Sequence, residues 1–115
     1  INKTMANTLK TVKTNAVSTT ASTLYTTPGA TTTIVIGMTA ANILSASNVD
    51  VDITLHDSAG DAGTHLVKGA TIAPGGSLVP IGGDQKVIME TGYAMKATSS
   101  DSDSIDIIMS IVEQT

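Results

Sequence analysis

The stretch from Val49 to His56 constrains the fold most, because apolar and polar residues alternate in it for eight residues without a break. Successive side chains of a β-strand point to opposite sides, so this pattern predicts a strand with one buried face and one wet face. A shift of one residue would bury both carboxylates, so the register is strongly specified. We expect an inward set and an outward set, the outward set facing water or a partner: Val49, Val51, Ile53 and Leu55 against Asp50, Asp52, Thr54 and His56.

Turn-forming residues divide the rest of the chain into further short strands. Residues 57–63 are rich in Asp, Ser and Gly, and an apolar run resumes at 64–67, which predicts a β-hairpin. Gly37 lies inside a β-branched run and indicates a bulge or a close approach of another backbone. We expect Tyr93 to Ala97 to pair back on Lys86 to Glu90. The expected strands are 22–26, 31–40, 49–56, 64–67, 77–81, 86–90, 93–97 and 105–113.

This spacing predicts an all-β fold, a single antiparallel β-sandwich of Ig-like or jelly-roll-like type with about eight short strands. The chain has 115 residues, no Cys, Phe or Trp, and only Tyr25 and Tyr93 as aromatics, so the core must be aliphatic. The last strand, 105–113, is apolar on both faces, which places it in the centre of a sheet or under a partner. No apolar run approaches the roughly 18 residues of a membrane span, and no export signal is recognisable, so we expect a soluble product.

We divide the chain into an N-terminal extended arm or edge strand, residues 1–20, and a β-sandwich domain, residues 21–115. Residues 1–4 precede a Met-Ala-Asn that is typical of a translation start, so we interpret them as an upstream extension. Three lysines are the only charges before Asp50, whereas the remainder holds three lysines and ten carboxylates, giving +3 and −7. Such asymmetry suggests head-to-tail contact between copies or a basic arm that contacts an acidic neighbour, and a solvated arm is the simpler interpretation. The candidate interface residues are Lys3, Lys10, Val12, Lys13, Val17, Ile108 and Val112.

The sequence predicts no catalytic, metal-binding, phosphate-binding or nucleic-acid-binding site. His56, Asp57, Asp61 and His65 could converge on a metal, but their spacing matches no structural zinc pattern. Residues 101–106 begin like a calcium loop yet lack its Gly and closing Glu. The chain has no Gly-x-Ser-x-Gly elbow, no phosphate-binding Gly-Lys motif and no Arg. We therefore expect no enzyme, cofactor, metal, nucleic acid, membrane or small-molecule substrate.

Seven segments follow one another in a characteristic order: Leu24 to Gly29, Thr32 to Asn42, the alternating strand to Asp57, Leu66 to Lys68, Ile72 to Leu78, Val87 to Gly92 and Ile107 to Glu113. Together they resemble the small β-sandwich virion proteins of tailed bacteriophages. The resemblance runs from about Leu24 to Thr115, although Tyr93 follows Gly92 where such proteins often have an acid, so no contact is carried over at that turn.

This resemblance implies a structural virion protein, foremost a capsid decoration or cement subunit that binds the outer shell and stabilises it. A neck, collar or tail-attached subunit is the alternative, and an adhesive glycan-binding module is the second alternative. The implied partners are other copies of the chain, with a trimer preferred, and the major capsid protein or other virion proteins. The implied location is the virion, assembled in the host cytoplasm.

Overall fold

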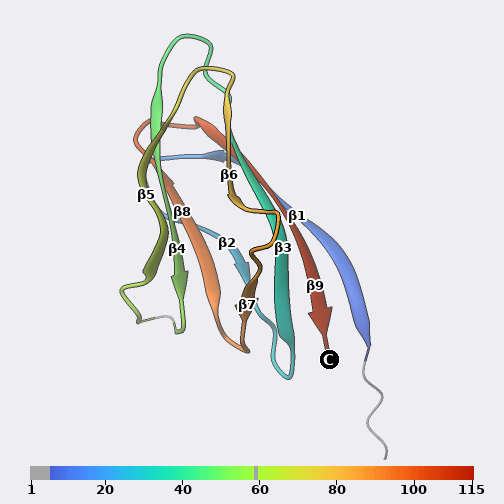
Figure 1. The fold of residues 1–115 in the computed structure, drawn as a ribbon. Coiled ribbons are helices and arrows are strands. Elements are labelled where there is room, and N and C mark those ends of the chain that lie inside the picture. The colour runs from blue at the N-terminus through green and yellow to red at the C-terminus, as the bar shows by residue number, and fades with distance from the viewer. Residues whose placement is uncertain (1–5, 59) are drawn as a thin grey trace, which may run out of the picture.

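The structure is a computed structural model that describes residues 6–58 and 60–115. These residues form nine β-strands and no helix, in two antiparallel sheets that face each other (Figure 1). The strands are β1 (Asn7–Val17), β2 (Ser22–Thr26), β3 (Thr32–Asn42), β4 (Val49–His56), β5 (Thr64–Ile72), β6 (Ser77–Ile81), β7 (Val87–Met89), β8 (Ala94–Ser99) and β9 (Ile105–Gln114).

The strand order confirms the predicted all-β antiparallel sandwich. Sheet A has the order β1-β9-β3-β6, with β7 also paired to β3, and sheet B has the order β2-β8-β4-β5. The last strand, β9, lies between β1 and β3, so it is central within sheet A. The register of β3 against β9 shifts between Val35 and Gly37, which confirms the predicted bulge.

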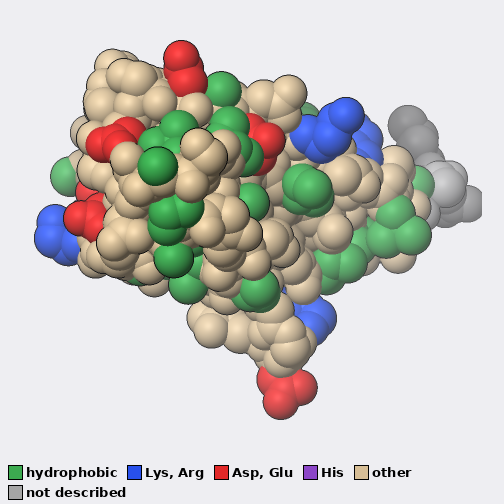
Figure 2. Space-filling model, turned by 90° about the horizontal axis from the view of Figure 1, so that it is seen from above, with side chains coloured by type: hydrophobic (Ala, Val, Ile, Leu, Met, Phe, Trp, Pro, Cys, Tyr) green, Lys and Arg blue, Asp and Glu red, His purple; other side chains and the backbone are tan. Residues whose placement is uncertain are grey.

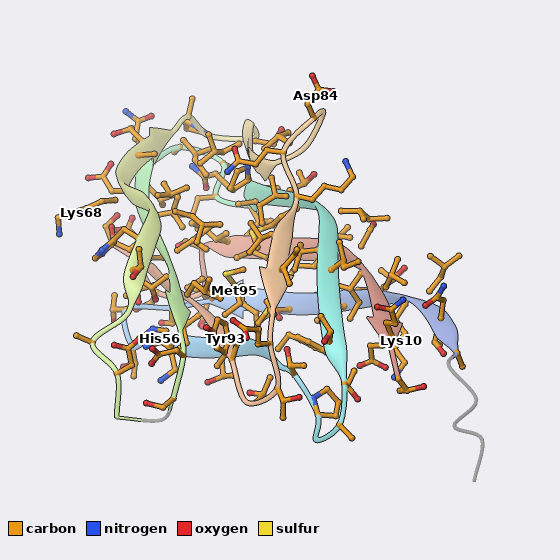
Figure 3. The ribbon with its side chains drawn as sticks, turned by 60° about the horizontal axis from the view of Figure 1, so that its bottom comes forward. Lys10, His56, Lys68, Asp84, Tyr93 and Met95 are labelled. Carbon is orange, nitrogen blue, oxygen red and sulfur yellow. The ribbon has the colours of Figure 1, made fainter. Side chains whose placement is uncertain are left out.

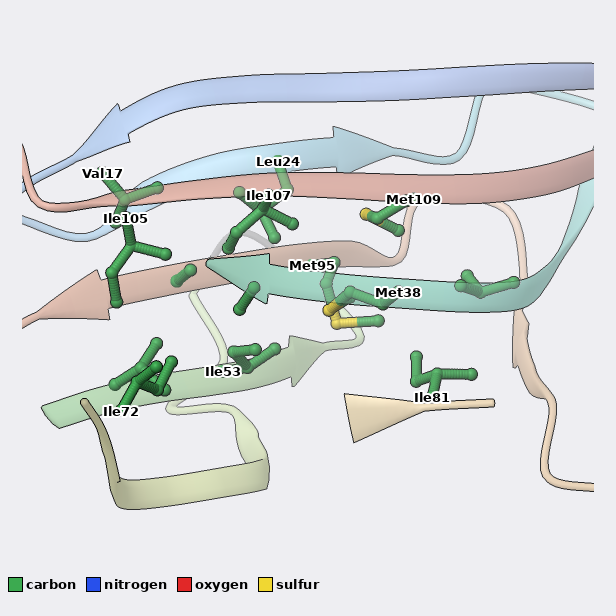
Figure 4. Close-up of a cluster of buried hydrophobic side chains, with 14 of the residues drawn as sticks. Val17, Leu24, Met38, Ile53, Ile72, Ile81, Met95, Ile105, Ile107 and Met109 are labelled. Carbon is green, nitrogen blue, oxygen red and sulfur yellow. The ribbon is translucent and has the colours of Figure 1, made fainter. Parts of the chain in front are cut away.

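The core lies between the two sheets and is aliphatic. Ile53 and Met95 project into it from sheet B, and Met38, Ile107 and Met109 from sheet A (Figure 4). Methionine is unbranched and adapts to irregular spaces, so it fills a core that has no phenylalanine or tryptophan. Both sheets thus bury one face against the other.

The alternating strand is β4, and it forms the predicted hairpin with β5. Val49, Val51 and Ile53 are fully buried, as expected. The expectation fails at the end of the strand, where His56 is only 8% exposed and Leu55 is half-buried. His56 is buried because residues of the β4–β5 loop cover it on the outer side of the sheet: a Cβ atom at Gly63 would lie 2.6 Å from its ring.

The predicted pairing of the segments 86–90 and 93–97 is wrong. β7 pairs with β3 in sheet A, whereas β8 pairs with β2 and β4 in sheet B. The turn between them therefore crosses from one sheet to the other, and it is held by hydrogen bonds from the Thr27 amide to the Tyr93 carbonyl and from the Gly92 amide to the Thr27 carbonyl. Buried Met89 and Met95 consequently enter the core from opposite sides.

Candidate interaction surface

An unbroken row of aliphatic side chains crosses the outer face of sheet A. Leu9 of β1 is opposite Val112 of β9, Val112 is opposite Ile34 of β3, and Ile34 is opposite Ile88 of β7. Directly opposite residues share a face of the sheet, so four strands each contribute one residue to the row. Leu9 is 76% exposed and Ile88 is 61% exposed, while the two central residues are half-buried. We call this row the aliphatic ridge.

The same face is hollowed beside the ridge. Thr11 is opposite Ser110, and Ser110 is opposite Gly37, so the next row holds only small side chains. The bulge sets Ile36 on the edge of this row, where it is partly exposed. The result is an open depression of about 230 Å³, which we call the hollow; it is lined by Leu9, Lys10, Thr11, Ile36, Ser110 and Ile111.

Rows that contain polar residues close the face at both ends of the strands, although the second of them is centred on the exposed Ile108. On one side of the ridge, Gln114 is opposite both Asn7 and Thr32. On the far side of the hollow, Ile108 is opposite Lys13 and Thr39. Figure 2 shows hydrophobic and lysine side chains on the right of the molecule. The middle of the face is therefore aliphatic or small.

The outer face of sheet B has a different chemistry. Asp52 is opposite Thr98, and Thr54 is opposite Lys96. The Thr71 hydroxyl donates to Asp50 Oδ1 over 2.6 Å. These side chains are polar, and the large hydrophobic residues that are exposed on the described strands lie in sheet A, so the aliphatic character belongs to that sheet.

A polar cluster between the sheets anchors β1. Lys10 Nζ lies 2.8 Å from Glu113 Oε1, and the Tyr25 hydroxyl from sheet B donates to Glu113 Oε2. The same hydroxyl is 2.9 Å from Thr33 Oγ1. The hydrogen bonds from Lys10 and then Tyr25 hold the pKa of Glu113 below its usual value, and burial followed by the Glu113 contact raises the pKa of Tyr25 to about 12. Figure 3 shows Lys10 beside the end of β9.

The candidate interface residues of the N-terminal segment have different surroundings. Lys3 lies outside the described residues. Lys13 is exposed on the outer face of sheet A, whereas Lys10 is bound to Glu113. Val12 is half-buried against the core and Val17 is 1% exposed within it, so the Val17 side chain does not reach the surface of the chain. Residues 7–17 are thus an edge strand of the sandwich.

The other two candidates, Ile108 and Val112, do lie on the outer face of sheet A. Ile108 is 51% exposed, and Val112 belongs to the aliphatic ridge. Sequence reasoning missed Leu9, Ile36 and Ile88, which complete the aliphatic character of this face. A signal was present for Ile36 and Ile88, because each interrupts the alternation expected of a strand with one wet face.

Two of the four hairpin side chains considered for a metal, His56 and Asp61, make contacts within the protein. His56 Nε2 is 2.8 Å from Thr54 Oγ1, and His56 Nδ1 is 3.0 Å from the Asp61 carbonyl. The backbone amide of Asp57 donates to the Asp61 carboxylate and lowers its pKa. Within residues 6–58 and 60–115, no three His, Cys, Asp or Glu side chains are grouped so that they could hold a metal ion.

Across residues 6–58 and 60–115, no helix has the length and apolar character needed to cross a membrane.

No protein-family model and no curated protein matches the chain. Among solved structures, the chain is similar to one from work describing Bacillus endospore appendages as a novel family of disulfide-linked pili. The match covers 98% of this chain and 88% of that chain, with 14% sequence identity and a TM-score of 0.54, so the two proteins share a fold.

Proposed function

We propose that the chain is a structural subunit of a multi-copy assembly, and that it decorates the shell of a tailed-phage virion. The aliphatic ridge is the observation that carries the proposal. A mostly exposed leucine and isoleucine at its two ends leave apolar area in water, and burying one such side chain fully is worth about 1.5–3 kcal/mol. Contiguous apolar area on a folded surface is typical of a protein interaction site.

Modest contacts suffice for a subunit of this kind. Copies that bind side by side on a lattice gain avidity, so each interface can be small while the assembly stays intact. A sheet face also suits this role, since its side chains are held by strands that pair on both sides. Here Val112 and Ile34 stand on β9 and β3, the two strands at the centre of sheet A.

The resemblance to tailed-phage virion proteins supports the decoration role. The structural neighbour supports the broader role, because it comes from work on the disulfide-linked pili of Bacillus endospores. A subunit of a surface appendage is therefore the second candidate. Both candidates require many copies held together by protein contacts, and they differ in the particle that contains the chain.

Density-gradient fractions of a lysate from the source of the chain would test the proposal. An antibody against the chain is expected to detect it in the fractions that hold phage particles, in a fixed ratio to the shell protein. Detection in a filament fraction instead would support the appendage role. Detection only among unassembled proteins at the top of the gradient would contradict both.

A charge reversal tests whether β1 contributes to binding. Deleting residues 1–17 would remove the whole edge strand and expose β9, so a point change is more informative. Lys13→Glu reverses an exposed charge on the outer face of sheet A, and Lys68→Glu is the matched change on β5 of sheet B. We expect reduced occupancy of particles for the first variant and unchanged occupancy for the second.

A further inference from the structure

We infer that the outer face of sheet A is the contact between two copies of this chain, related by a two-fold axis that crosses the strands between the ridge and the hollow. The inference rests on the proposed structural role and names the partner that this face fits. The register of four strands places the ridge and the hollow in neighbouring rows of one surface, two residues apart along β1 and β9.

The geometry is self-complementary. Rotation about such an axis keeps β1 over β1 and β9 over β9 but exchanges the two rows, so the ridge of each copy lies over the hollow of the other. Leu9 of one copy then meets Thr11 of its partner, and Val112 meets Ser110. In a two-fold contact each residue pair occurs twice, so the ridge fits into the hollow at two symmetry-related places. The hollow of about 230 Å³ in one copy gives the Leu9 side chain of the other copy a space to enter.

The area is that of a small interface. The rows that the axis exchanges run from Asn7 to Lys13, which is about 23 Å along the strands, and four strands spaced about 4.8 Å apart span about 19 Å, so the face offers roughly 440 Å². This is a projected area, and the accessible area of a face with protruding side chains is larger. Standard protein interfaces bury about 800 Å² on each partner. Two β-sheets also pack well face to face, at a spacing of about 10 Å.

The charges at the margin are compatible with this arrangement. The axis places Lys13 of one copy over Asn7 of the other, where an amide oxygen can accept a hydrogen bond. The two Lys13 side chains are then about six residues apart along the strand direction, which is about 20 Å and beyond the screening length in physiological salt. Three further charged residues border the face. Lys10 lines the hollow and is paired with Glu113, while Lys86 and Glu90 lie two residues before and after Ile88, just beyond β7.

The test uses the same substitution on the two outer faces. Thr11→Lys places a charge in the floor of the hollow, and Thr23→Lys places one at an exposed position of β2 in sheet B. Native mass spectrometry and sedimentation velocity of the full chain, without particles, are expected to show a dimer. Thr11→Lys should weaken it by roughly 100-fold or more, because a lysine buried without a partner is strongly disfavoured. Thr23→Lys should leave the dissociation constant unchanged within about twofold. Circular dichroism checks that both variants fold.

A cross-linking experiment tests separately whether the ridge of each copy lies over the hollow of the other. Introduced cysteines can be cross-linked selectively, because the chain contains no cysteine of its own. A mixture of Leu9→Cys and Thr11→Cys proteins should be joined efficiently by a short bismaleimide, whereas a mixture of Leu9→Cys and Thr23→Cys proteins should not. A monomer at the highest soluble concentration, a trimer, or a dimer unaffected by Thr11→Lys would each overturn the inference. A dimer that is absent from gradient particles would contradict the proposed function and leave the dimer contact standing.

Discussion

Removing one hydroxyl, in Tyr25→Phe, tests how the edge strand β1 is held to the sandwich. The Tyr25 hydroxyl donates to the Glu113 carboxylate and also contacts Thr33, so it links sheet B to two strands of sheet A. A hydrogen bond to a charged group contributes about 1.5–3 kcal/mol. Glu113 is only 8% exposed, so water replaces the lost donor poorly. We expect Tyr25→Phe to lower the free energy of unfolding by about 1.5–3 kcal/mol, and the melting temperature by about 6–12 °C.

Tyr93→Phe is the matched control, because Tyr25 and Tyr93 are the only aromatic residues of the chain. The Tyr93 hydroxyl donates to Glu90 at an exposed position, 2.9 Å away, so we expect its removal to leave the unfolding midpoint unchanged. Urea unfolding followed by far-ultraviolet circular dichroism measures both variants. Equal midpoints for the two variants would refute the role assigned to the cluster around Glu113.

The effect of Tyr25→Phe should depend on pH. The pKa of Glu113 is lowered in the folded chain, first by Lys10 and then by Tyr25, so the unfolded chain takes up more protons as pH falls. The stability from this carboxylate is therefore complete above its unfolded pKa, near 4.5, and is lost as pH falls through the lower folded value. The difference between wild type and Tyr25→Phe should be largest near neutral pH and should narrow below pH 4.5. A difference that grows in acid would contradict this reasoning.

Three further measurements follow from the structure. In Tyr93→Phe protein, absorbance should show the remaining Tyr25 ionising near pH 12, and stability should fall above pH 10, because the unfolded phenol ionises first. Ile53→Asp should abolish folding, since Ile53 is fully buried, whereas Asp52→Asn should fold normally; similar circular dichroism spectra would contradict the assigned faces. Gly63→Ala should lower the melting temperature more than Gly83→Ala: both have positive φ, but only at Gly63 would the new Cβ clash, at 2.6 Å from His56.

The sequence predicts part of the aliphatic outer face of sheet A. The apolar character of β9 on both faces indicated Ile108 and Val112 as interface residues. Leu9 gave no such signal, because it is the single apolar residue among the outward residues of β1 from Asn7 to Lys13 and becomes part of a row only through pairing. Leu9 and Val112 are adjacent in space although more than a hundred residues separate them in the chain.

The sequence by itself determined which side of most strands is buried, because side chains alternate along any strand whatever its neighbours. Alternation thereby determined the aliphatic core, whereas turn-forming residues determined the hairpin of β4 and β5, and a glycine in a β-branched run indicated the bulge at Gly37. Only the tertiary structure decided which strands are neighbours: it separated β7 from β8, placed β9 beside β1, and covered His56 with a loop. Alternation shows which side of a strand is buried, but it does not show which strands are paired. A row of side chains across four strands forms only when those strands pair.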